Sequence, residues 1–127
     1  MNRQELIDYV SITYAENAER PFANDQSIVV FRHSSGRKWF CVVMTIEKKK
    51  LEIMQNGYID IINVKCAQEI IDSFWQESGI FPAYHMSKAH WLSVALDGSA
   101  TDDTIKWLLD LSHTLTAPKI KKKNAPQ

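Results

Sequence analysis

The residues with the greatest chemical potential lie between positions 81 and 91, a stretch with two histidines, a lysine and three aromatic side chains. Histidines can bind metal ions or transfer protons, and His85 and His90 are the candidates. They are five positions apart, in a predicted loop and at a strand start, without an HExxH helix or a neighbouring carboxylate. We therefore expect no metal here, and Lys88 between them is a candidate for binding rather than catalysis.

The other side chains that could act as nucleophiles are isolated. Cys41 lies inside a predicted strand, where a cysteine is usually a small packing residue, and Ser112 lies on the inward face of a predicted helix. Cys41 and Cys66 are 25 positions apart, which matches neither a CxxC motif nor a metal site. No GxSxG, P-loop or GxGxxG pattern occurs. The sequence predicts a non-enzymatic protein with no cofactor and two free thiols.

Length and charge narrow the class of protein. A chain of 127 residues with 45% hydrophobic residues can form one core, so we expect a single domain over residues 1–118 and a lysine-rich, disordered tail over residues 119–127. No secretory signal and no apolar run of about 20 residues is present, which predicts a soluble, cytoplasmic protein without a membrane segment. Net charge is zero, but residues 31–65 carry +4 while residues 1–30 and 66–118 carry −3 and −5. A local basic face is therefore compatible with the overall neutrality.

The first half of the chain predicts a helix followed by strands. Asn2 with Glu5 three positions later resembles a capping box, and the apolar residues at 6, 7, 10 and 14 share one face of a helix that Pro21 ends. The predicted strands span residues 27–32, 38–46, 51–54 and 58–64. The first two form a hairpin around the turn at residues 34–36, and an Asn-Gly turn at residues 56–57 precedes the last.

The second half predicts two helices around one strand. The first covers residues 67–78, with Phe74 and Trp75 on its apolar face and Gly79 as its C-cap, and the strand covers residues 91–96. Thr101 caps the last helix, whose first turn is acidic and which Pro118 ends. Its inward stripe consists of Ile105, Leu108, Leu109, Ser112 and Leu115.

Strand alternation predicts which side chains face the helices. In the strand 38–46, Phe40, Val42, Met44 and Ile46 are all apolar, so we expect them to face the helices and Trp39 to point the other way. In the strand 91–96, Leu92, Val94 and Leu96 should face inward. Trp39 and Trp91 would then lie on the open face, where they either cover the sheet or form an aromatic surface for a partner.

Several segments, in this order, carry a resemblance to a known family: Val30-Phe31-Arg32, Gly36-Arg37-Lys38-Trp39-Phe40, Asn63-Val64-Lys65-Cys66, Phe81-Pro82-Ala83-Tyr84-His85-Met86, Lys88-Ala89-His90-Trp91 and Leu108-Leu109-Asp110-Leu111-Ser112. Nearly the whole chain resembles the bacterial MmcQ/YjbR family. The resemblance implies an α+β, CyaY-like (frataxin-like) fold, a two-layer structure in which three helices pack on one face of an antiparallel sheet. It also implies DNA binding, because some members are described as double-wing DNA-binding proteins. His113 departs from the family pattern, which usually has a tyrosine there.

The residues give this implication a physical form. Basic side chains flank the predicted turns, and aromatic rings lie beside them: the candidate binding residues are Arg32, Arg37, Lys38, Trp39, His85, Lys88, His90 and Trp91, with a second basic turn at residues 48–50. Cations at turns can reach phosphates while a tryptophan stacks on a base. With zero net charge, DNA affinity should be weak and salt-sensitive. The alternative is a protein-interaction or adaptor domain that uses the aromatic face. Oligomeric state stays open.

Overall fold

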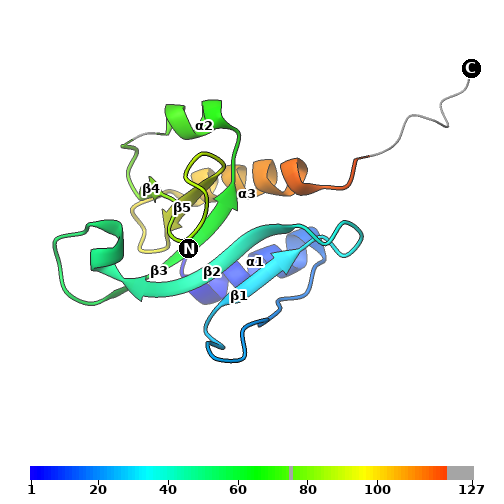
Figure 1. Ribbon diagram of the computed structural model, residues 1–127, viewed down its shortest axis with the longest axis horizontal. Helices are drawn as coiled ribbons and strands as arrows, with labels where there is room; N and C mark the ends of the chain where they lie inside the picture. Colours follow the sequence, from blue (N-terminus) through cyan, green and yellow to red (C-terminus); the bar gives the residue numbers. More distant parts are fainter. Residues whose placement is uncertain (75, 120–127) are drawn as a thin grey trace, which may run out of the picture.

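The computed structural model describes residues 1–74 and 76–119, arranged as in Figure 1. The elements are α1 (Arg3–Tyr14), β1 (Val29–Arg32), β2 (Trp39–Glu47), the 3₁₀ helix η1 (Lys48–Leu51), β3 (Tyr58–Lys65), α2 (Gln68–Ser73), β4 (Ile80–Pro82), β5 (Trp91–Ala95) and α3 (Asp102–Thr116). Within the described residues, the strands form one antiparallel sheet in the order β1-β2-β3-β5-β4. The predicted α+β class is confirmed.

Local signals set the helix starts. Asn2 and Glu5 form the predicted capping box, in which each side chain accepts a hydrogen bond from the other residue's backbone N–H. The Thr101 side chain accepts from the backbone N–H of Thr104 at the start of α3. The end of α1 was predicted too late: the helix stops at Tyr14, where Ala15 turns into the left-handed region with φ 54°.

The main core fills the space between the sheet and the helices α1 and α3, whose ribbons pass behind the strands in Figure 1. Leu6 and Val10 of α1 and Leu108 of α3 are fully buried against it. Its sheet residues are Val29, Phe31, Phe40, Cys41, Val43, Ile62, Val64, Ile80, Leu92 and Val94. We call the opposite side of the sheet the outer face.

The predicted orientation of β2 is wrong after its second residue. Phe40 faces the helices as expected, but Cys41 and Val43 follow it into the main core, while Met44 and Ile46 belong to a smaller cluster on the outer face. The cause is a β-bulge: Phe31 pairs with Cys41 and Arg32 pairs with Trp39, so Phe40 is an extra residue in β2. One extra residue reverses the face of every later side chain. The orientation of β5 was predicted correctly, because Leu92, Val94 and Leu96 all lie in the main core.

The outer face is partly covered by the chain's own loops. Its apolar cluster consists of Ile46, Leu51, Ile59, Ile61 and Ala95, with Met44, Ile53, Phe81 and Tyr84 packed against it. Leu51 comes from η1, which replaces the strand predicted at residues 51–54. Residues 48–57 form the protruding connection at the left of Figure 1.

Some further predictions need correction, and others concern residues that the structure does not describe. The helix predicted at residues 67–78 is only the six-residue α2, and β4 was not predicted at all. Leu115 is 47% exposed and does not belong to the inward stripe of α3, although Ser112 does. Trp75 and tail residues 120–127 lie outside the described residues. Across the described helices, none combines the length and apolar character of a membrane span.

Candidate binding surface on the outer face

The connection between β4 and β5 is held on the outer face by a buried polar triangle. The Asn63 side-chain amide donates to the carbonyl oxygen of Tyr84 (2.9 Å), the Tyr84 backbone N–H donates to Ser93 Oγ (2.9 Å), and Ser93 Oγ donates to Asn63 Oδ1 (2.5 Å). Asn63 and Ser93 are fully buried and face each other on β3 and β5. Buried polar groups are costly unless they are paired, and here each one has a partner. The triangle therefore fixes the backbone at Tyr84.

This fixed backbone determines where two of the predicted binding residues lie. His85 follows Tyr84 with φ 57°, and its ring lies against the Tyr84 ring with centroids 4.1 Å apart. Lys88 Nζ donates to the carbonyl oxygen of Ala83 (2.8 Å). Tyr84 and His85 border a cleft beside Met44, Ile46 and Lys50, in the half of β2 that leads to η1. The contacts of His85 and Lys88 therefore stabilise the loop that covers the outer face.

Trp39 and Trp91 lie at the other end of the outer face, where β2 and β5 begin and β3 ends (Figure 1). Trp91 is paired with Lys65, the last residue of β3, and Trp39 is paired with Arg32. By alternation from Ser93 and Asn63, both Trp91 and Lys65 point to the outer face. Both tryptophans and Lys65 are half-buried, and the Phe22 ring meets Trp39 edge-on at 6.0 Å. Neither indole is fully buried.

Three exposed polar residues directly precede these tryptophans in the sequence. Arg37 and Lys38 lie on the β1–β2 turn, and His90 directly precedes Trp91, with its carbonyl oxygen accepting from the backbone N–H of Cys66 (2.8 Å). We define the tryptophan end as Trp39, Lys65 and Trp91 together with Arg37, Lys38 and His90. Five of these residues were predicted from the sequence. Lys65 was missed, although its two-residue spacing from Asn63 could have placed it on the same face.

The remaining predicted cation is already engaged. Arg32 Nε donates to Glu19 Oε2 (2.8 Å), and the shallow depression between them also includes Glu16 and Arg37. The Glu19 carboxylate neutralises Arg32, so Arg32 serves mainly to tie β1 to the segment after α1. That segment also pairs with β1 through two backbone hydrogen bonds between Glu19 and Val30.

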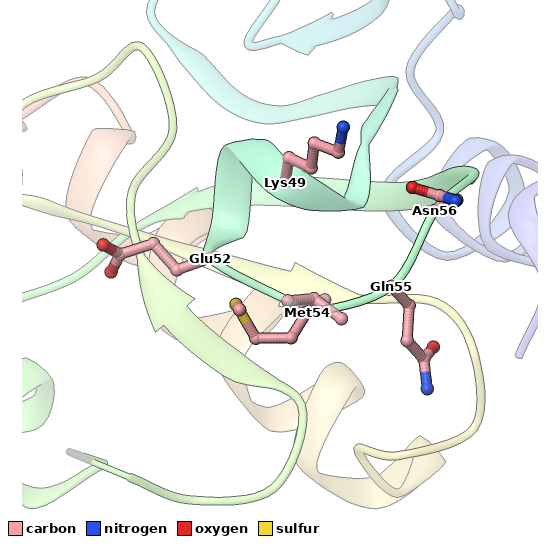
Figure 2. A pocket seen from close by; sticks show the side chains of 6 residues that line it. Lys49, Glu52, Met54, Gln55 and Asn56 are labelled. Atoms are coloured by element: carbon pink, nitrogen blue, oxygen red, sulfur yellow. The ribbon is translucent and has the colours of Figure 1, made fainter.

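The second basic turn is remote from the tryptophan end. Lys48, Lys49 and Lys50 form η1 beyond the far end of β2, a strand of nine residues and therefore about 30 Å long. Figure 2 shows the depression beside η1, in which the side chains of Lys49, Glu52, Met54 and Gln55 diverge. One local segment lines it, without converging polar groups. The two basic turns therefore do not form one compact patch.

The thiols have the properties of packing residues. Cys41 and Cys66 are buried and unpaired. Burial raises the pKa of the Cys66 thiol to about 11 and raises the pKa of Cys41 still further, so both stay protonated at neutral pH. Among the described residues, no three His, Cys, Asp or Glu side chains are grouped closely enough to hold a metal ion.

Comparisons with known proteins agree with this architecture. The YjbR family model matches residues 13–115. The uncharacterized protein YyaQ of Bacillus subtilis is 32% identical over 116 residues, which cover 91% of this chain and 98% of YyaQ. The uncharacterized protein YjbR of Escherichia coli K12 is 38% identical over 53 residues, which cover 41% of this chain and 45% of that protein.

Two solved structures extend the comparison to the fold. A crystal structure of a Pseudomonas syringae protein matches with a TM-score of 0.90 and 37% identity, covering 92% of this chain and 100% of that one. A Deinococcus radiodurans protein with a DUF419 domain matches with a TM-score of 0.63 and 23% identity, covering 96% of this chain and 81% of that one. The second likeness concerns the fold alone.

Proposed function

The chain belongs to the YjbR family, and we propose that it is a non-catalytic binding module whose tryptophan end binds DNA. The predicted family resemblance is thereby confirmed, but the relatives named above are uncharacterized and supply no ligand. The proposal rests on one observation: two half-buried indoles flank a lysine at one end of a sheet face, and two further cations lie on the adjoining turn.

This combination fits unpaired DNA better than a closed duplex. Bases of a single strand can stack on indoles, which contributes about 1–3 kcal/mol per base, while nearby cations meet the phosphates. Trp39 and Trp91 are held by the sheet, so little side-chain freedom is lost on stacking. Lys65, Arg37 and Lys38 are the three cations placed to contact the backbone of such a strand.

The number of cations sets the expected salt dependence. Three phosphate contacts give a slope of log affinity against log salt between about −2.1 for a single strand and about −2.7 for duplex DNA. Affinity should therefore fall about 20- to 40-fold between 50 and 200 mM salt. Such a protein binds weakly at physiological salt, in keeping with its zero net charge.

Fluorescence anisotropy with a labelled oligonucleotide and its duplex tests the proposal. Lys65→Gln should weaken binding and reduce the salt slope by about 0.7–0.9. Lys49→Gln, which removes the same charge from the far basic turn, is the matched control and should change neither. Trp91→Ala should weaken single-strand binding by about 5- to 150-fold. Absence of binding to both DNA forms at 25 mM salt would exclude the proposal.

A protein partner is the second candidate, and one observation favours it. Phe22, Trp39 and Trp91 form an aromatic surface, and aromatic residues dominate the energetics of protein interfaces. In a pull-down, Trp39→Ala and Trp91→Ala should then lose a partner that wild type retains in high salt. Equal recovery by all three proteins would remove this alternative.

A further inference from the structure

A histidine pair connects the β1–β2 turn to the end of α3. His33 is 5% exposed, and its Nε2 lies 2.8 Å from the carbonyl oxygen of His113 and 3.0 Å from Thr116 Oγ1. A carbonyl oxygen can only accept, so His33 Nε2 carries a proton and donates it. The Thr116 hydroxyl donates to the carbonyl oxygen of Ser112 (2.7 Å) and can therefore accept from His33. The buried turn residue is thus bonded to the last turn of α3.

The ring of His113 is half-buried among three aromatic rings. It stacks on Tyr14 with centroids 4.5 Å apart and lies 4.2 Å from the His33 ring, while the Phe40 ring meets it edge-on at 4.9 Å. The two imidazoles are thus in contact. A positive charge on the half-buried His113 ring loses part of its hydration, and charges on both rings would repel at close range.

The titratable groups around His113 come from three elements. The hydroxyl of Tyr14 on α1 donates a hydrogen bond to Asp110 on α3. The carboxylate of Glu16, which follows α1, accepts a hydrogen bond from the backbone N–H of Ser34 (3.2 Å). Burial and then the neighbouring His33 lower the pKa of His113, while Glu16 and Asp110 oppose the shift. Cys41 on β2 stays protonated, because burial raises its pKa. The docked arrangement therefore favours a neutral His113.

His33 also holds the basic turn in shape. Its backbone N–H donates to the carbonyl oxygen of Lys38 (3.1 Å), and its carbonyl oxygen accepts from the N–H of Arg37 (2.7 Å). The same turn packs on Pro118, two residues after α3: a Cβ added at Gly36 would stand 2.7 Å from Pro118 Cγ. The positions of Arg37 and Lys38 thus depend on the docking of this turn against the end of α3.

We propose that His33 and His113 form an acid-sensitive latch, in which protonation of His113 beside the His33 ring releases the β1–β2 turn from α3 and displaces Arg37 and Lys38 from the tryptophan end. This regulation rests on the proposed DNA binding. A group whose pKa is lower in the docked state binds its proton more tightly after release. The ratio of docked to released molecules is therefore highest above the ordinary histidine pKa of about 6.5. It falls by up to tenfold per pH unit for one proton as the pH drops from there to the lowered pKa of the docked state.

Backbone amide and histidine ring resonances recorded by NMR between pH 8 and 5 test the latch directly. In wild type, the amides of Gly36, Arg37 and Lys38 should shift together with the His113 ring titration. His113→Phe keeps an aromatic ring in the stack without a titrating group, so its turn amides should stay in place over this range. His85→Asn, which removes an exposed histidine at a left-handed position that asparagine tolerates, is the control and should behave like wild type.

Oligonucleotide affinity measured over the same pH range gives the functional arm. Relative to His113→Phe, wild type should lose affinity at least threefold between pH 7.5 and 5.5. If neither protein binds DNA at any pH, the proposed function fails, and the amide titration still decides whether the latch exists. Turn amides in wild type that do not move with the His113 titration would overturn the latch, whether or not the variant folds.

Discussion

The polar triangle beneath Tyr84 yields the sharpest prediction about stability. Ser93→Ala removes one oxygen that both donates to Asn63 Oδ1 and accepts from the Tyr84 backbone N–H. Both partners lose a hydrogen bond, and Asn63 is fully buried while Tyr84 is half-buried. Each unsatisfied buried group costs about 1–3 kcal/mol, and water can reach the Tyr84 side more easily. We expect a loss of about 2–4 kcal/mol in the free energy of unfolding.

Urea denaturation followed by far-UV circular dichroism measures this loss. With an m-value of about 1.5–2 kcal/mol/M, the midpoint should fall by about 1–2.5 M. Hydrogen exchange at Tyr84 and His85 should accelerate more than exchange in α3, because the fixed loop is released first. Ser87→Ala in the same loop is the control: Ser87 is exposed, and its removal should change stability by less than about 0.5 kcal/mol.

A double-mutant cycle tests whether the triangle acts as a unit. Asn63→Ala and Ser93→Ala remove parts of the same network, so the double variant should be more stable than the sum of the two single losses predicts, by about 1 kcal/mol or more. If Ser93→Ala is as stable as Ser87→Ala, the triangle does not hold the β4–β5 loop on the outer face.

Two further predictions concern glycine and cysteine positions. Gly79→Ala should cost about 2–4 kcal/mol of stability in thermal or urea unfolding, because φ is 78° and the new Cβ would stand 2.6 Å from the backbone nitrogen of Ala100. Gly57→Ala, at φ 106° with open space around it, should cost only about 1–2 kcal/mol. Equal losses of stability in the two variants would contradict the role of the close approach at Gly79. At pH 8 a thiol with the pKa of Cys66 is about 0.1% thiolate, so Ellman's reagent should label the native protein slowly. In 8 M urea the reagent should label both thiols rapidly. Fast labelling of Cys66 in the native protein would refute its burial.

The sequence predicts those features that depend on neighbouring residues. The capping box at Asn2, the cap at Thr101 and the β1–β2 hairpin are local, because each is set by side chains a few positions apart. Five of the six residues of the tryptophan end could also be named in advance, since strand alternation and basic turns can be recognised without coordinates. The family resemblance also predicted the class of fold correctly, because its motifs can be recognised in the sequence without coordinates.

Features that depend on distant partners could not be predicted. The bulge at Phe40 is determined by its pairing with β1. The apolar run from Trp39 to Met44 offers two equally good orientations, so its pattern could not reveal the reversal. β4 has only three residues, one of them Pro82, and is a strand only because β5 pairs with it. Nothing local indicates that Asn63 would bond to a loop 21 positions away.

The distribution of charge explains why a neutral protein can still present one surface to a polyanion. The segments that contain α1, α2 and α3 carry the acidic excess, whereas residues 31–65, which form β2, η1 and β3, carry the basic excess. Since α1 and α3 lie on the face opposite the tryptophan end, the molecule is electrically asymmetric across the sheet. Such asymmetry orients a protein in the field of a charged partner even when its net charge is zero. In the proposed complex, Lys65 would meet the phosphates on the side of the sheet away from the acidic helices α1 and α3.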